Sequence, residues 1–169
     1  MKAKLALVFS IALAALAANA HAADPNANKR TLERGKYVAM IGGCNDCHTS
    51  GYPERGGKVP ESEWLTGVSV GFQGPWGTTY PANLRLVAQS MTEAQWVARF
   101  RSEMRPPMPW FNLNAMSDAD VRALYRYVRN LGAKGEPAPA YVPPGQTAQT
   151  PYFVFVPQNL PAAVKTSAK

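Results

Sequence analysis

The chain has 169 residues, of which 18 are Lys or Arg and 11 are Asp or Glu, so its formal net charge is +7. Hydrophobic residues make up 46% and charged residues 17%, which is enough apolar surface for a core and excludes a disordered or fibrous chain. The length suits one domain or two small ones. With only two cysteines and two histidines, a disulfide-dense scaffold and a zinc site built from two cysteine pairs are excluded.

Residues 1–22 show the three parts of a secretory signal peptide: a basic start, an apolar run over 5–18 and small residues at the end. The apolar run is shorter than the roughly 20 residues that a membrane span needs, although an uncleaved anchor is the alternative. We expect cleavage after Ala22, with Ala20 as the second choice. The sequence therefore predicts a periplasmic protein with no membrane span after cleavage.

Cleavage after Ala22 removes two lysines and no acidic residue, so the net charge falls from +7 to +5. It also removes His21, which leaves His48 as the single histidine of the mature chain. The first predicted helix of that chain covers residues 31–41 and ends at Gly42-Gly43.

Residues 43–49 read Gly-Cys-Asn-Asp-Cys-His-Thr, in which Cys44, Cys47 and His48 form the C-x-x-C-H signature of haem c attachment. Two thiols three positions apart can each add to one vinyl group of the same porphyrin. The adjacent imidazole is then held beneath the macrocycle, with a nitrogen free to bind iron. The motif predicts one haem c, bound covalently through Cys44 and Cys47.

Three other kinds of site could use this motif, and the sequence favours none of them. A zinc site needs more ligands than the chain holds. A thioredoxin-like dithiol follows a strand in a βαβ unit, whereas a helical pattern precedes Cys44. A structural disulfide between Cys44 and Cys47 would close a very small loop and constrain little of the unfolded chain.

With this motif behind an export signal, the chain resembles class I single-haem c-type cytochromes, particularly the small cytochrome domains found beside periplasmic dehydrogenases and oxidases. The resemblance runs from about residue 31 to residue 131. It implies an all-α class I cytochrome c fold, with about three main helices and long loops around one haem. On this basis, residues 23–135 form the cytochrome domain, and residues 136–169 form a Pro-rich C-terminal extension.

Residues 50–89 are rich in Gly, Pro, Ser and Thr and are predicted to be a loop, which a haem could support as a large apolar core element. The segment from Gly74 to Asn83 resembles the one that borders the haem in related cytochromes. Trp76 and Tyr80 could hydrogen-bond a haem propionate through their polar tips, or could pack as ordinary aromatic residues. A second helix is predicted over 92–103, with Thr92 and Gln95 forming a capping box.

In the class I cytochromes that the chain resembles, the sixth iron ligand is usually a methionine far downstream of the histidine. Met108 is the preferred candidate, because Pro106, Pro107 and Pro109 fix the backbone around it and a rigid loop loses less entropy on presenting its thioether. Met104 is the alternative. The remaining methionines of the mature chain are predicted to be packing residues, namely Met40, Met91 and Met116.

The third predicted helix begins after the capping residue Ser117 and ends at Gly132, and the resemblance places Leu124 or Tyr125 near Gly35 of the first helix. Three arginines recur along one face of this helix: Arg122, Arg126 and Arg129. This face is predicted either to be solvated or to dock a partner. From residue 136 the chain is Pro-rich, and the β-prone run 152–156 predicts either an edge strand strapped over the domain or a partner-binding segment.

His48 and Met108 together would fill both axial positions of the iron, which favours electron transfer over oxygen or peroxide chemistry. We therefore expect an electron carrier rather than an enzyme, exchanging electrons with a dehydrogenase, an oxidase or another cytochrome. The alternative is a tethered cytochrome subunit that accepts electrons from a periplasmic dehydrogenase and docks through its tail. A haem peroxidase lacks a second histidine as distal base, and export argues against nucleic-acid binding.

Overall fold

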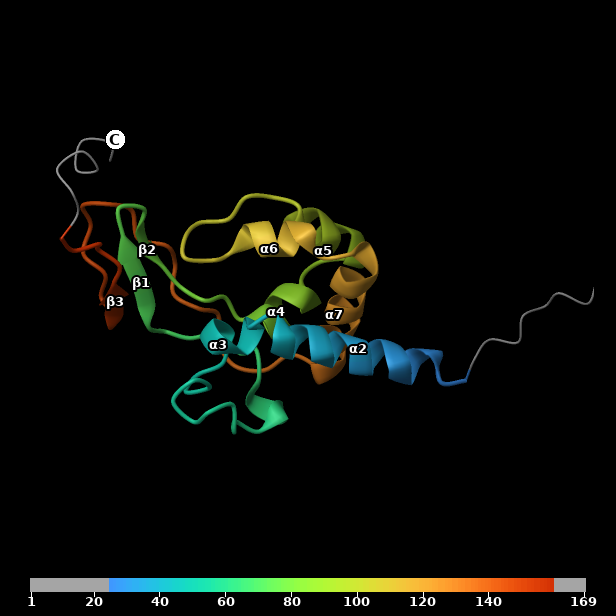
Figure 1. Cartoon of the computed structure of the whole chain (residues 1–169). Coiled ribbons are helices and arrows are strands. Elements are labelled where there is room, and N and C mark those ends of the chain that lie inside the picture. Colours follow the sequence, from blue (N-terminus) through green and yellow to red (C-terminus); the bar gives the residue numbers. More distant parts are fainter. Residues whose placement is uncertain (1–24, 160–169) are drawn as a thin grey trace, which may run out of the picture.

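A computed structural model describes residues 25–159 (Figure 1). The predicted signal peptide lies outside these residues, as does the end of the chain from residue 160. The described part contains six α-helices, one 3-10 helix and three β-strands. None of the helices within residues 25–159 combines the length and the apolar character that crossing a membrane requires.

The helices α2 (Ala27–Ile41) and α7 (Asp118–Leu131) lie side by side as the central pair of the molecule (Figure 1). Gly35 lets them approach, because a Cβ at this position would lie 2.1 Å from the carbonyl oxygen of Ala123 and 2.5 Å from Cβ of Tyr127. The predicted close contact of the two helices at Gly35 is confirmed, but its partners are Ala123 and Tyr127 rather than Leu124 or Tyr125.

The local signals at the ends of the later helices are confirmed. Ser117 caps α7 by accepting a hydrogen bond from the backbone N–H of Asp120, and the helix ends before Gly132. The capping box of Thr92 and Gln95 is present at the start of α5 (Glu93–Phe100), which ends three residues earlier than expected. The first helix, by contrast, ends at Ile41 as expected but begins four residues early, at Ala27, since local signals fix helix bounds only to within a few residues.

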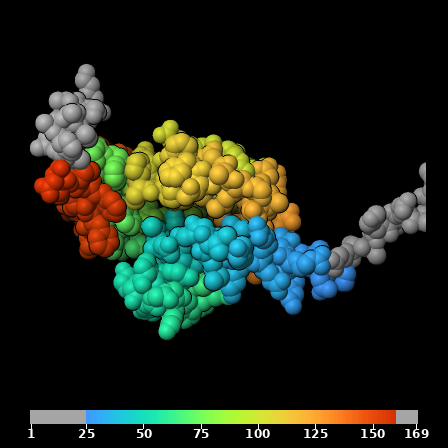
Figure 2. All heavy atoms as spheres, viewed as in Figure 1, coloured from blue at the N-terminus to red at the C-terminus, as the bar shows by residue number. Residues whose placement is uncertain are grey.

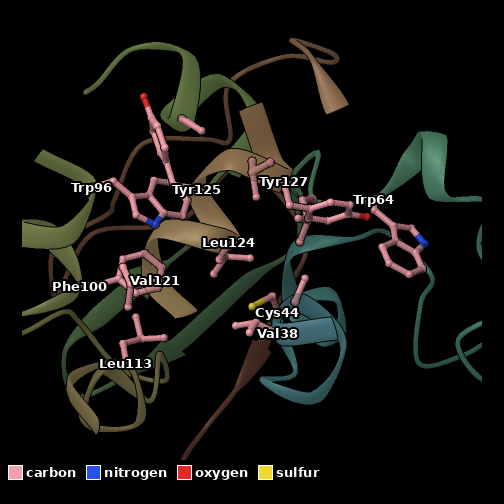
Figure 3. Close-up of a cluster of buried hydrophobic side chains, with 14 of the residues drawn as sticks. Val38, Cys44, Trp64, Trp96, Phe100, Leu113, Val121, Leu124, Tyr125 and Tyr127 are labelled. Atoms are coloured by element: carbon pink, nitrogen blue, oxygen red, sulfur yellow. The ribbon is translucent and has the colours of Figure 1, made fainter. Parts of the chain in front are cut away.

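The apolar core lies between these helices and contains aromatic side chains from several elements (Figure 3). Trp96 stacks on Phe100 with ring centroids 4.9 Å apart, and Tyr125 packs against Trp96 at 5.7 Å. The sulfur of Cys44 lies among these apolar side chains, close to Leu124 in the view of Figure 3. The core therefore extends directly to the predicted attachment motif.

The expected all-α class I fold is wrong. The strands β1 (Gly71–Gly74), β2 (Gly77–Thr79) and β3 (Tyr152–Val154) form a three-stranded mixed sheet in the order β2-β1-β3, with β1 antiparallel to β2 and parallel to β3. The Gly-rich segment was expected to be loop, but its two-residue turn makes a hairpin. The β-prone run of the extension then adds as a third strand at one end of the molecule (Figures 1 and 2).

Gly77 explains how the extension reaches the hairpin. Its φ of +93° is a conformation that favours glycine, and a Cβ here would lie 2.3 Å from the carbonyl oxygen of Val142. Val142 pairs with Thr78 through two backbone hydrogen bonds of 2.8 and 3.0 Å. The residues after α7 therefore pass over the hairpin and return to it as β3.

Four short helices were not foreseen as separate elements: α3 (Cys44–His48), the 3-10 helix η1 (Glu61–Glu63), α4 (Leu84–Gln89) and α6 (Trp110–Ala115). Within the expected loop, α4 forms because Asn83 caps it, accepting a hydrogen bond from the backbone N–H of Leu86. Each of these helices is too short to show a full apolar period in the sequence.

The arginine face of α7 contacts other helices of the same chain. Arg122 and Arg126 both pair with Glu93 of α5, at 3.0 and 2.8 Å. Arg129 donates to the backbone carbonyls of Ala88 and Gln89 at the end of α4. These arginines thus connect α7 to α4 and α5.

Candidate functional site

A cavity of about 250 Å³ opens between α3, α4, α5 and the segment 101–109, and the C-terminal extension closes part of it. Its lining is mostly apolar and contains all four predicted cofactor residues, Cys44, Cys47, His48 and Met108. Residues far apart in the sequence form the rest of the wall, including Phe72, Leu84, Val87, Phe100, Leu113, Pro139 and Tyr141. The fold therefore brings the motif and the downstream methionine to one cavity.

Cys44 and Cys47 lie three positions apart on α3, which begins after Gly43 in the left-handed conformation, with φ +65°. Both are free thiols rather than a disulfide, and Cys44 is buried whereas Cys47 is exposed. Burial raises the pKa of the Cys44 thiol to about 11, and burial also raises the pKa of Cys47. The two thiols are thus available to one ligand in the cavity.

His48 is the best-positioned side chain of the motif. It is buried, and its Nδ1 lies 2.7 Å from the carbonyl oxygen of Ala82. Because a carbonyl can only accept, Nδ1 carries the hydrogen and the lone pair of Nε2 remains free. Burial lowers the pKa of His48, with the Ala82 hydrogen bond acting in the opposite direction, so the ring is the neutral form that binds metals.

The backbone around His48 is held by the segment that precedes α4. The carbonyl of His48 accepts a hydrogen bond from Gly67 at 2.8 Å. Asn83, which follows Ala82, donates from its side chain to the carbonyls of Lys134 and Glu136. The chain just after α7 therefore holds Asn83, the neighbour of the residue whose carbonyl orients the imidazole.

The five methionines of the described chain separate into two groups. Met104 and Met108 both line the cavity, whereas Met40, Met91 and Met116 do not. Met91 and Met116 pack against the core as predicted. The prediction for Met40 as core filler is wrong, since it is 49% exposed on the outer face of α2.

Trp76 and Tyr80, the suggested propionate partners, already have partners within the chain. The indole N–H of Trp76 donates to the carbonyl of Phe72 at 3.3 Å, and Trp76 does not line the cavity. Tyr80 does line it, and its hydroxyl accepts from Thr150 of the extension at 2.9 Å. Of the two, Tyr80 alone contacts the space in which a cofactor would lie.

The charge of the cavity suits haem. Two arginines line it, Arg99 and Arg105, and its lining includes no acidic residue. Neither arginine takes part in an ion pair found among residues 25–159. A mostly apolar wall with free thiols, a neutral imidazole, a thioether and two cations fits a flat apolar macrocycle that carries carboxylates.

Several residues of the cavity wall were not found from the sequence. Arg99 and Arg105 carry no local signal that separates them from surface arginines. Tyr141 lies in the extension, outside the domain boundary expected at residue 135, yet lines the cavity. These residues reach the site through long-range packing, which a pattern along the chain does not record.

The chain is similar in sequence to several curated proteins. The chain is 32% identical over 141 residues to the gluconate 2-dehydrogenase cytochrome c subunit of Pantoea cypripedii, covering 75% of this chain and 28% of that protein. It is 29% identical over 136 residues to the cytochrome c subunit of the quinone alcohol dehydrogenase of Gluconacetobacter polyoxogenes, covering 73% and 27%. This chain is similar to the cytochrome c subunits of dehydrogenases. The similarity supports an electron carrier rather than a catalytic subunit.

The chain spans about a quarter of the length of these relatives. A third relative, the fructose dehydrogenase cytochrome subunit of Gluconobacter japonicus, is 25% identical over 114 residues, which cover 61% of this chain and 22% of that protein. No known family profile and no solved structure matches the chain.

Proposed function

We propose that this chain is an exported single-haem cytochrome c module that accepts electrons from a periplasmic dehydrogenase and docks on it through the C-terminal extension. The observation that carries the proposal is the convergence of Cys44, Cys47 and His48 with Met104 and Met108 on one apolar cavity that lacks acidic residues. The similarity to dehydrogenase cytochrome c subunits supports it.

When bound, haem c supplies one-electron oxidation and reduction at its iron. In this proposal the thiols of Cys44 and Cys47 would hold the cofactor covalently, and Nε2 of His48 would bind its iron. The Ala82 carbonyl keeps the imidazole in the required tautomer and orientation. Met108 would supply a second ligand to the iron, and its thioether would favour a higher reduction potential than a second histidine.

The rest of the cavity wall keeps water away from the bound group. Phe72, Phe100 and Leu113 contribute apolar surface from three separate elements. Low water content disfavours extra charge near the iron and reduces the solvent reorganisation that accompanies each electron transfer. Arg99 and Arg105 would offset carboxylates at the margin of the cavity, since both side chains reach solvent.

The strand β3 provides the proposed docking face. Tyr152, Phe153 and Val154 are all exposed, and Phe155 and Val156 continue the exposed apolar run. An exposed apolar run of this kind is typical of a protein-binding surface. The relatives carry subunit names, so the proposed occupant of this face is a dehydrogenase subunit.

The docking face is connected to the cavity by aromatic contacts. The ring of Phe72 packs against Phe153 and Phe155, with centroids 5.9 and 5.6 Å apart, and Phe72 itself lines the cavity. A partner seated on β3 would therefore lie one side chain away from the cofactor site. This arrangement suits electron transfer between docked proteins.

Absorption spectra of the ferric and ferrous protein test the cofactor and its ligands. We expect a low-spin, six-coordinate haem that stays attached to the denatured chain, and Cys44→Ala should weaken that attachment. Met108→Ala should abolish the methionine-to-iron band of the ferric form, whereas the control Met104→Ala should keep it. A five-coordinate, high-spin wild type would contradict the proposed ligation.

Exchange of β3 side chains tests the docking face. We expect the wild-type chain to co-purify with a flavin or quinone dehydrogenase whose substrate reduces the haem. A Phe153→Ser, Val154→Ser double variant should lose this partner and keep its spectrum. The matched control is Phe111→Ser, because Phe111 is 61% exposed on α6, outside the docking face. Monomeric wild type without such a partner would instead indicate a freely diffusing carrier.

A further inference from the structure

The segment that joins α5 to α6, residues 101–109, carries both candidate methionine ligands. It has few hydrogen bonds of its own near Met108, whose N–H contacts the carbonyl of Arg105 at 3.3 Å and whose carbonyl accepts from Trp110 at 2.8 Å. These local bonds shape a turn but do not fix its distance from His48 across the cavity. Arg101 fixes the start of the segment through its hydrogen bonds to Leu113, Met116 and Asp118, and two contacts with the opposite wall hold the part near Met108.

The first such contact comes from β2. The hydroxyl of Thr79 donates to the carbonyl of Pro106 at 2.7 Å, and Thr79 also lines the cavity. Pro106 lies two residues before Met108, within the rigid Pro-rich turn. One hydroxyl of the hairpin therefore holds the methionine-bearing turn by its backbone.

The second contact comes from the C-terminal extension. The guanidinium of Arg105 lies over the ring of Tyr141 at 4.0 Å, a cation–π stack. Tyr141 is itself held, because its hydroxyl donates to the carbonyl of Trp76 at 2.7 Å and its neighbour Val142 pairs with Thr78. Both contacts thus lead from the methionine segment to the same hairpin.

We infer that Thr79 and Tyr141 are positioning residues that hold the segment 101–109 closed over the cavity and so keep the thioether of Met108 on the iron. This inference rests on the proposed haem ligation. Each residue acts through Arg105 or Pro106 rather than through the cofactor. Loss of either contact should leave the methionine easier to displace while the haem and its thioether bonds remain in place.

Displacement of the methionine by imidazole measures this directly. Imidazole binds the ferric protein only when Met108 leaves, so its apparent dissociation constant reports how firmly the methionine is held. One hydrogen bond or one stacked cation of ordinary strength corresponds to roughly a three- to tenfold change in that constant. We expect Thr79→Val and Tyr141→Leu each to tighten imidazole binding by roughly that factor.

Conservative variants separate positioning from general destabilisation. Thr79→Ser keeps the hydroxyl and should stay within about twofold of the wild type. Tyr141→Phe keeps the ring under Arg105 but loses the hydrogen bond to the carbonyl of Trp76, so it should tighten imidazole binding less than Tyr141→Leu does. Thr31→Val is the matched control, since the Thr31 hydroxyl also donates to a backbone carbonyl, that of Ala27, but lies on α2. It should leave imidazole binding unchanged.

The outcomes distinguish this inference from the proposed ligation. Wild-type imidazole affinity in both Thr79→Val and Tyr141→Leu, together with a large effect of Met108→Ala, overturns the positioning role alone. No effect of Met108→Ala overturns the ligand assignment itself. A tightening in Thr31→Val equal to that in Thr79→Val would show that any loss of stability loosens the methionine, and would also overturn the positioning role.

Discussion

The two halves of the molecule are held together by different means. In the helical half, α2, α5 and α7 bury apolar side chains against one another, and α7 alone has six buried residues. The other half consists of the hairpin and the extension, which includes β3. All three residues of β3 are exposed, and β3 contacts the hairpin through backbone hydrogen bonds and packed aromatic rings. We therefore expect the first half to supply most of the stability, whereas the second arranges the chain around the cavity.

Two glycines give the sharpest test of this difference, because a methyl group at either one would meet a backbone carbonyl. Gly35→Ala forces α2 and α7 apart and should cost about 3 kcal/mol or more of unfolding free energy. Gly77→Ala should displace the extension locally, which hydrogen exchange at Val142 would detect, with a smaller fall in the thermal midpoint. Equal global losses for the two variants would contradict the division into halves.

The control for Gly77→Ala is Gly145→Ala. Gly145 has a comparable φ of +81°, but a Cβ there would meet nothing within 4 Å. It isolates the cost of the left-handed conformation, about 1 kcal/mol. Any larger loss in Gly77→Ala then measures the contact with the extension.

Arg85, on α4, joins the end of α7 to the 3-10 helix η1 and should give the next largest effect. Arg85 is 5% exposed, and its guanidinium donates to the carbonyls of Ser62, Leu131 and Gly132, so it completes the end of α7. Arg85→Met leaves these part-buried carbonyls without their donor and should cost about 1–2 kcal/mol in denaturant unfolding. Arg85→Lys should recover only part, because an ammonium cannot reproduce the fork of the guanidinium.

The smallest expected effect lies within the helical half and depends on pH. The hydrogen bond from Arg126 lowers the pKa of Glu93, with Arg122 adding to it. A lowered folded-state pKa stabilises the protein above the unfolded value, about 4.3, and this contribution disappears as the pH falls through the folded pKa. Glu93→Gln should therefore cost about 0.5 kcal/mol at pH 7, since the pair reaches solvent.

The measurement for Glu93 is thermal unfolding of the wild type and Glu93→Gln between pH 7 and pH 3. The difference between their midpoints should shrink as the pH falls and vanish at the acid end. A difference that persists at pH 3 would show that packing of the side chain, rather than its charge, joins α5 to α7.

The helical half and the motif were predictable because their signals are local. Ser117, the Thr92–Gln95 capping box and Gly132 each act within a few residues, and C-x-x-C-H is contiguous. The sheet was missed because β3 pairs with residues some 80 positions earlier, and its partner strand is Gly-rich. Likewise, neither Arg105 nor Tyr141 carries a local feature that would place it at the cavity.

The parallel pairing of β3 with β1 leaves the outer edge of β3 open within the described chain. An apolar edge strand is a template for further strands, so the isolated protein should self-associate when no partner covers it. Pro151 and Pro157 flank the run and interrupt any longer ladder, acting as gatekeepers against fibrous growth. The same edge that would recruit a partner thus makes solubility at high concentration depend on that partner.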